Sequence, residues 1–182
     1  MTNATQGWYW HFVRCDGDGT PRLNYGDGRK ILVGETLTIE GEPVLCEHGL
    51  HASKRAIDAL GYCRYDACLC LVELGGTVVH GDDKSVATAR TVVTMLSREQ
   101  TNTLLAEFAR WCALAVAHLW EMPEALRQYL ETGDNSLRSA AWHAAEAAAR
   151  DAGWFAGRDA ARAAQSEWLE SRATEMMGAR HD

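Results

Sequence analysis

The chain has 182 residues, of which 47% are hydrophobic and only three are prolines, and it carries a net charge of −7. This composition excludes an intrinsically disordered protein, and the length fits one domain or one domain with an extension. The acidic balance argues against nucleic acid as a partner, because phosphate contacts need a surplus of lysine and arginine on one face. No apolar stretch approaches the roughly 20 residues of a membrane span, so we expect no membrane partner.

The six cysteines indicate a reducing compartment and not a disulfide framework. Residues 1–7 are polar and lack the basic and apolar regions of a secretory signal. We therefore expect a cytoplasmic protein whose cysteines are free thiols. The cysteines are Cys15, Cys46, Cys63, Cys68, Cys70 and Cys112.

Short apolar and β-branched runs between turn residues predict a β-rich front half that ends near Leu96. Gly75-Gly76 is predicted to form a hairpin turn between two of the strands. Ser53 is predicted to cap a short helix that ends at Gly61, and Gly81-Asp82-Asp83 resembles a further turn. The expected strands are residues 8–13, 31–33, 36–39, 68–74, 77–80 and 86–96.

Helical patterns begin directly after Leu96. Ser97 with Gln100 three residues later is a capping-box pattern. Apolar residues spaced three and four apart then predict a first helix, and Pro123 favours the start of a second one. The expected helices cover residues 99–120, 123–131 and 136–177, the last with a break at Gly153 or Gly157.

The last helical stretch contains a loose alanine-rich repeat over residues 140–164, punctuated by Trp142 and Trp154 and followed by Trp168. Alanines let helices approach closely, while tryptophans supply the buried area that alanine lacks. We interpret this half as a structural hairpin or a surface for homo-oligomerisation. The sequence as a whole predicts an α+β protein: an antiparallel or mixed β-rich domain with one or two short helices over residues 1–96, then a helical bundle or hairpin over residues 97–182.

Polar residues that could carry chemistry gather in the front half. Cys46-x-His48-x-x-His51 has ligand types that suit zinc, but zinc sites normally show two pairs at regular spacing. We therefore expect no metal here, and a zinc-stabilised interaction module is kept as an alternative. Cys68 and Cys70 alternate on a strand and are expected in the core.

His51 offers a second interpretation, because it stands between a predicted strand and a predicted helix. A histidine there could hydrogen-bond a ligand hydroxyl, while the helix N-terminus favours a phosphate. Tyr62 ends the same helix, where its ring could stack on a flat ligand. The alternative is a buried, structural His51 and a core Tyr62.

Residues 44–62 (VLCEHGLHASKRAIDALGY), then CLCLVEL and GTVVHGDDKSVATARTVV, resemble an uncharacterised family of phage and prophage proteins. The shared features are a C-x-x-G-[LF]-H-A core, a following A-L-x-Y, a strand that ends in V-E-L-x-G, and a D-D-K step. The resemblance covers about residues 8–96 and extends to the back half by composition. It implies a phage-encoded protein in the host cytoplasm.

A more distant resemblance is to ADP-ribosyltransferase-like folds, including the RNA 2′-phosphotransferases. There, a G-[FL]-[IVH]-H-[LAC]-S strand end supplies a histidine to NAD, and residues 49–53 are similar to it. The resemblance implies NAD as the cofactor. The implied cofactor-binding residues are His11, His51, Ser53 and Tyr62, and the implied catalytic residues are His51, Tyr62 and Glu73.

Two classes of function follow from these patterns. In the first, the front half binds NAD and transfers ADP-ribose, with an acidic group that stabilises the oxocarbenium-like state as nicotinamide leaves. In the second, the chain is a non-catalytic, phage-encoded binding or anti-defence protein of the anti-CRISPR kind. Its acidic surface and helical half would then engage a host protein.

Overall fold

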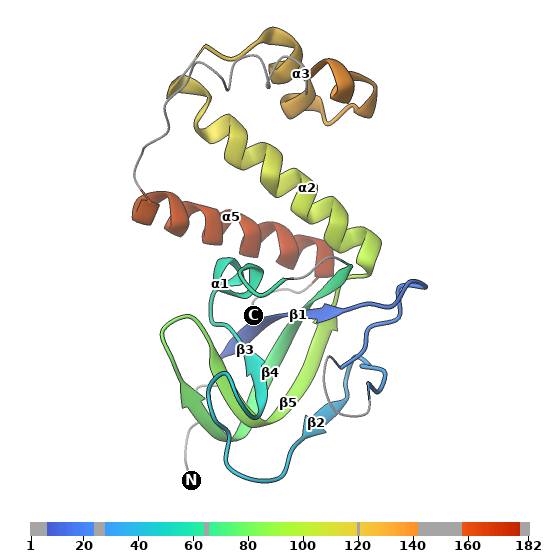
Figure 1. Ribbon diagram of the computed structural model, residues 1–182, viewed down its shortest axis with the longest axis vertical. Helices are drawn as coiled ribbons and strands as arrows, with labels where there is room; N and C mark the ends of the chain where they lie inside the picture. The colour runs from blue at the N-terminus through green and yellow to red at the C-terminus, as the bar shows by residue number, and fades with distance from the viewer. Residues whose placement is uncertain (1–6, 24–27, 64–65, 120, 142–157, 179–182) are drawn as a thin grey trace. The chain divides into compact units, whose positions relative to one another are not determined.

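Five antiparallel strands form a sheet in the front part of the chain, as the computed structural model shows (Figure 1). They are β1 (Trp8–Arg14), β2 (Thr36–Thr38), β3 (Leu50–Ala52), β4 (Ala67–His80) and β5 (Ser85–Met95). Their order is β1-β4-β5-β2, and β3 pairs with β5 as well. A backbone bridge between Trp10 and Ser53 joins the end of β3 to β1, so the sheet curls until its first strand meets its third.

The structure describes residues 7–23, 28–63, 66–119, 121–141 and 158–178. The chain divides into two compact units, one of residues 1–102 with 166–182 and one of residues 103–165. The sheet, a short helix α1 (Ala56–Leu60) and the second half of the last helix belong to the first unit. The predicted α+β class is therefore confirmed, while the predicted division into two domains at Leu96 stays a prediction.

The hairpin between β4 and β5 differs from its prediction. β4 runs without interruption through Gly75-Gly76, and the chain reverses instead at Gly81–Lys84, where the Gly81 N–H donates to the Lys84 carbonyl at 2.8 Å. Gly76 has a φ of +70° at a register shift, since Gly75 pairs with Ala89 but Val78 pairs with Ala87. The two glycines therefore accommodate a β-bulge and not a turn.

The predicted strand at residues 31–33 is also wrong. This segment is not part of any strand: the Ile31 N–H donates to the Pro21 carbonyl, and the chain turns at Val33-Gly34. Ile31 is nevertheless 1% exposed and belongs to the core. Burial of one side chain, without a continuous ladder of hydrogen bonds, explains why the apolar pattern resembled a strand.

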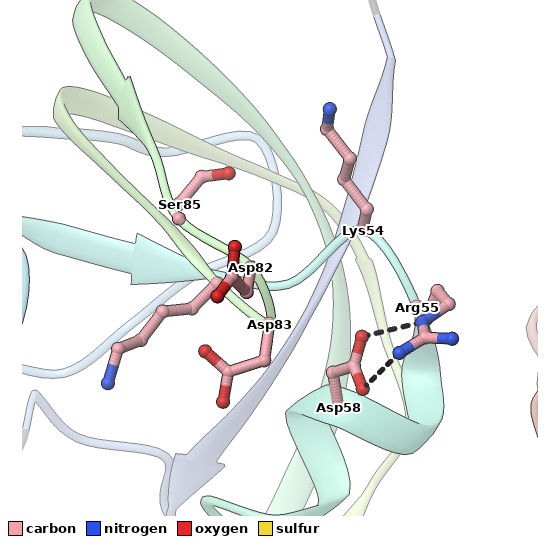
Figure 2. A pocket seen from close by; sticks show the side chains of 8 residues that line it. Lys54, Arg55, Asp58, Asp82, Asp83 and Ser85 are labelled. Atoms are coloured by element: carbon pink, nitrogen blue, oxygen red, sulfur yellow. Dashed lines mark hydrogen bonds and ion pairs between the residues drawn. The ribbon is translucent and has the colours of Figure 1, made fainter. Parts of the chain in front are cut away.

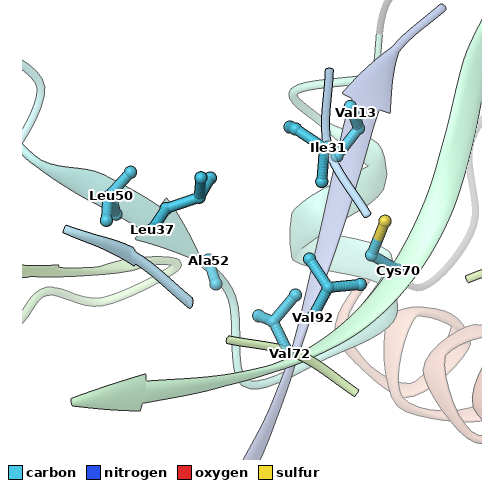
Figure 3. Close-up of a cluster of buried hydrophobic side chains, with 8 residues drawn as sticks. All are labelled: Val13, Ile31, Leu37, Leu50, Ala52, Cys70, Val72 and Val92. Carbon is cyan, nitrogen blue, oxygen red and sulfur yellow. The ribbon is translucent and has the colours of Figure 1, made fainter. Parts of the chain in front are cut away.

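That core lies on the inner face of the curled sheet (Figure 3). β4 contributes the alternate residues Cys70 and Val72, β1 contributes Val13 and β5 contributes Val92, and β2 and β3 close the cluster from the other side. The cluster consists of Val13, Ile31, Leu37, Leu50, Ala52, Cys70, Val72 and Val92. Leu50 and Ala52 flank His51, so packing of this core fixes the strand that carries the candidate histidine.

Helix α1 begins at Ala56 and has no side-chain cap of its own, which corrects the predicted cap at Ser53. Ser53 is buried and uses its backbone to exchange two hydrogen bonds with Trp10. The Ala56 N–H instead donates to Oε1 of Glu170 at 2.8 Å, and the same oxygen accepts from the Ser166 hydroxyl. A carboxylate 114 residues away therefore caps the helix.

Replacing Glu170 with alanine should lower the free energy of unfolding by about 1 to 2 kcal/mol, because two hydrogen bonds to a carboxylate are lost and the Ala56 N–H loses its acceptor. Glu170→Gln keeps an acceptor oxygen and should cost less. Urea denaturation measures both, with Glu167→Ala as the control because Glu167 is exposed on the same helix. Equal losses for Glu170→Ala and Glu167→Ala would contradict the cap.

The back part of the chain is helical, as predicted. Its elements are α2 (Arg98–Ala115), a 3-10 turn η1 (Ala117–Leu119), α3 (Glu124–Thr132), a 3-10 turn η2 (Asn135–Leu137) and α5 (Arg158–Met177). The predicted first helix thus ends as an α-helix at Ala115. Trp142, Trp154, the predicted helix break and most of the alanine-rich repeat lie outside the described residues.

The capping box at the start of α2 is confirmed. The Ser97 N–H donates to Oε1 of Gln100 at 2.9 Å, and the Gln100 N–H donates to Oγ of Ser97 at 3.1 Å. Pro123 precedes α3 and Gly133 ends it with a left-handed φ of +69°. None of the helices in the described part of the chain combines the length and the apolar character needed to span a bilayer.

Candidate functional site

The His51 side chain is hydrogen-bonded to the loop that precedes β3 and holds its conformation. Nε2 of His51 accepts a hydrogen bond from the Cys46 N–H at 3.1 Å, and Nδ1 lies 3.2 Å from the Gly49 carbonyl. Because Nε2 accepts, the ring proton is on Nδ1 and points to Gly49. Cys46 has a left-handed φ of +67°, which this hydrogen bond holds in place. Both ring nitrogens of His51 therefore serve the fold of the loop.

The environment of His51 keeps its ring neutral. Burial lowers the pKa of His51 below its usual 6.5, and the positive charges of Lys84 and Arg90 lower it further, against the opposing effect of the Gly49 carbonyl. Arg90 is 1% exposed, and its Nη1 donates to the His51 carbonyl at 2.6 Å. A neutral imidazole is the form that can accept from a backbone N–H, so the charge and the geometry agree.

The residues of the predicted zinc pattern do not converge. The ring of His48 is hydrogen-bonded to the Glu40 carbonyl at 2.8 Å, while His51 meets the backbone of Cys46. Within the described ranges, no three histidine, cysteine or acidic side chains are placed to hold a metal ion.

Tyr62 lies beside the β4–β5 turn, although 21 residues separate it from Asp83. Its hydroxyl donates to Oδ2 of Asp83, and Nζ of Lys84 lies 4.4 Å from the centre of its ring. The bond to Asp83 raises the pKa of Tyr62. Hydrogen bonds to the Cys46 sulfur and to Tyr62 raise the pKa of Lys84, so its ammonium stays charged. The Tyr62 ring is 50% exposed and is not part of the core.

A small open cavity of about 170 Å³ lies next to this cluster (Figure 2). Lys54 and Arg55, which precede α1, and Asp58 of α1 line one side of it, and residues 81–85 at the β4–β5 turn line the other. Arg55 donates two hydrogen bonds to Asp58, at 2.7 and 2.9 Å. Three basic and three acidic residues thus line one cavity, and the opposite charges of Arg55 and Asp58 neutralise each other.

The structure brings together only part of the predicted site. His51 accepts a hydrogen bond from the Cys46 N–H, and Tyr62 contacts Lys84. Ser53, by contrast, is 2% exposed, and its backbone is hydrogen-bonded to β1. Glu73 lies in β4 opposite Trp8 and Thr91, and it does not line the cavity.

His11 is half-buried in β1, opposite Cys70. Burial lowers its pKa well below 6.5, and repulsion from the charge of Arg90, and from His51 when that ring is protonated, adds to the decrease. His11 and His51 therefore share the influence of one buried arginine, which the sequence pattern did not single out. Arg90 lies on a strand among valines and threonines, and only its burial distinguishes it from a surface residue.

The cavity residues Lys54, Arg55 and Asp58 were also missed. Their sequence, Lys-Arg-Ala-Ile-Asp, reads as an ordinary polar helix start, and its role depends on a turn more than 20 residues later in the chain. The turn itself carries a sequence signal, because Gly81-Asp82-Asp83 predicts a turn.

No curated protein and no solved structure matched the chain. Residues 21–104 are similar to a family described as a domain of unknown function, DUF7666, and that stretch contains every residue that contacts the cavity and the Tyr62 cluster.

Proposed function

We propose that this chain binds NAD, or a nucleotide with the same charge pattern, at the cavity beside Tyr62, as an ADP-ribosyltransferase-like domain. The observation that carries the proposal is the exposed Tyr62 ring next to a cavity of mixed charge. A half-exposed aromatic ring can stack on a nicotinamide or adenine base, and such stacking contributes about 1 to 3 kcal/mol per base.

The charges around the cavity support a ligand that is itself of mixed charge. NAD combines a cationic nicotinamide ring with an anionic diphosphate. In the proposed pose, the ring lies against Tyr62 and near Asp83, and the diphosphate lies near Lys54. A cavity of about 170 Å³ holds one ring or one phosphate group, so the rest of the ligand would lie along the open surface.

The residue roles in this proposal differ from those that the resemblance implies. His51 acts indirectly, since its two ring nitrogens hold the Cys46–Gly49 loop next to Lys84. Asp83, which lines the cavity, replaces Glu73 as the carboxylate that stabilises the oxocarbenium-like state when nicotinamide leaves. Catalysis at such a site would rest on positioning and electrostatics.

Titration with NAD tests the proposal. NAD at about ten times its dissociation constant should raise the Tm by about 3 to 6 °C, because a ligand that binds only the folded state stabilises it by mass action. Tyr62→Ala should weaken binding about tenfold through loss of stacking. Tyr62→Phe, which keeps the ring, should change the dissociation constant less than threefold. Calorimetry and thermal melting supply both measurements.

Lys54→Gln and Lys30→Gln form a matched pair of controls, since both lysines are exposed and only Lys54 lines the cavity. Lys54→Gln should weaken binding, and Lys30→Gln should leave it unchanged. An absence of any heat or melting shift with NAD at about 5 mM, above the upper end of typical KM values, would reject the NAD proposal.

Partner binding is the second candidate function, and exposed apolar side chains at the turn before β2 favour it. Leu32 and Val33 are adjacent and 50% and 55% exposed. A host protein, as the phage resemblance implies, or a second copy of the chain would cover them. Failure of NAD binding, together with capture of one defined partner that is lost in the Leu32→Ser variant, would favour this function over the first.

A further inference from the structure

Two cysteine side chains meet at one end of the β1–β4 pair. Cys15 directly follows β1, and Cys68 is the second residue of β4. Their Sγ atoms lie 2.6 Å apart, and the residues are 4% and 2% exposed. A disulfide bond joins two sulfurs at about 2.05 Å. A small rotation of the side chains therefore separates this contact from a covalent bond.

The strand register explains why the two sulfurs share a face. Val13 of β1 is opposite Cys68, and residues two apart on a strand point to the same side. The ladder extends one residue beyond β1, because the Cys15 N–H donates to the Asp66 carbonyl at 2.6 Å. Asp66 has a left-handed φ of +60°, which turns the backbone just before β4 begins.

We propose that Cys15 and Cys68 are a site of reversible covalent modification, at which an oxidised low-molecular-weight disulfide such as glutathione disulfide forms an intrachain disulfide. The thiolate of one cysteine attacks glutathione disulfide, which gives a mixed disulfide and releases one glutathione. The second cysteine then loses its proton and displaces the other glutathione. Two protein thiols are oxidised, one glutathione disulfide is reduced to two thiols, and the two cysteine protons are transferred to them.

The surroundings of the pair make this exchange slow at neutral pH. Burial raises the pKa of Cys15 to about 12 and also raises the pKa of Cys68, so the reactive thiolate is scarce. Glutathione disulfide would reach the pair from the side of Cys15, because Cys15 borders a turn in which Gly17 and Asp18 are exposed. Local opening of this turn uncovers a sulfur while the rest of the sheet stays folded.

The cross-link would join two cysteines that are 53 positions apart, and the segment between them supplies Tyr62 and one side of the cavity. β2, β3, α1 and Tyr62 all lie between Cys15 and Cys68. A disulfide that closes a loop of this length restricts the unfolded chain and stabilises the folded one. Oxidation should therefore stabilise the segment that carries His51 and Tyr62, whatever ligand the cavity binds.

The test is equilibration of the full chain with glutathione disulfide, followed by mass spectrometry and thermal melting. The oxidised wild type should lose about 2 Da, yield a Cys15–Cys68 cross-linked peptide, and melt on the order of 10 °C higher. Cys15→Ala should show neither the cross-link nor the increase in Tm. Cys70→Ala is the matched control and should react as the wild type does, since Cys70 is equally buried on the same strand.

Three results would overturn the proposal. They are alkylation of both cysteines as separate thiols after prolonged oxidation, a stable mixed disulfide with glutathione at each, or a cross-link from either cysteine to Cys70. The peptide map of the wild type decides among these outcomes by itself, so the test does not depend on the folding of the Cys15→Ala variant.

Discussion

Replacing Gly49 with alanine should lower the free energy of unfolding by about 3 to 4 kcal/mol, the largest effect that we expect from a single methyl group in this protein. Gly49 has a φ of +129°, where a side chain is strained. A Cβ atom there would lie 2.3 Å from Cγ2 of Val86, which is fully buried in β5 and cannot move aside. The backbone strain and the steric overlap both oppose the folded state.

Gly34→Ala is the matched control for this prediction. Gly34 has a φ of +82° but no atom within 4 Å of the position of a Cβ, so its substitution adds backbone strain alone. We expect a loss of about 1 kcal/mol for Gly34→Ala. Urea denaturation of the two variants isolates the overlap with Val86. Similar losses for both would show that β3 can move away from β5 near His51, contrary to the packing described above.

The stability of the protein should decrease as the pH falls below about 6.5, and His11 should account for a large share of the decrease. Burial places the pKa of His11 in the folded state well below its unfolded value of 6.5. Above pH 6.5 the ring is neutral in both states and has no effect. Below it, the unfolded chain binds a proton that the folded chain does not, which favours unfolding by about 1.4 kcal/mol per pH unit.

The variant His11→Gln tests this linkage because glutamine does not titrate. The slope of unfolding free energy against pH, measured with urea between pH 5 and 6.5, should be smaller by about one proton in His11→Gln than in the wild type. His51, whose folded pKa is also lowered, should sustain part of the remaining slope. Identical slopes for wild type and His11→Gln would mean that the ring is hydrated in the folded state.

His51 and Tyr62 differ in how well a substitution at each can test the proposed ligand site. Both ring nitrogens of His51 are hydrogen-bonded to the loop, so His51→Ala would disturb the fold and the site together. Tyr62 is exposed and its hydroxyl donates to Asp83 of the turn, so substitution of its side chain is the better test of ligand binding. The redox test needs no ligand at the cavity, because the reacting Sγ atoms of Cys15 and Cys68 contact each other.

The local elements of this protein could be predicted because their contacts lie close together in the chain. The capping box joins Ser97 to Gln100, three residues apart, and the turn at Gly81–Lys84 is closed by a hydrogen bond within four residues. The change from strands to helices after Leu96 follows from the period of the apolar residues. Such contacts need no partner from elsewhere, so residue type alone selects them.

The tertiary structure decided which of these elements form the site, since the deciding contacts join distant residues. Glu170 caps α1 in place of Ser53. Gly75-Gly76 forms a bulge and not a turn, because β5 pairs with β4 on both sides of it. The Tyr62 hydroxyl donates to Asp83. A sequence pattern names groups that can donate, accept or be buried, but the fold determines which partner is within reach. The ring of His51 is hydrogen-bonded to the backbone of its own loop, at Cys46 and Gly49. The motif that predicted a ligand-binding histidine therefore carries a histidine that holds this loop.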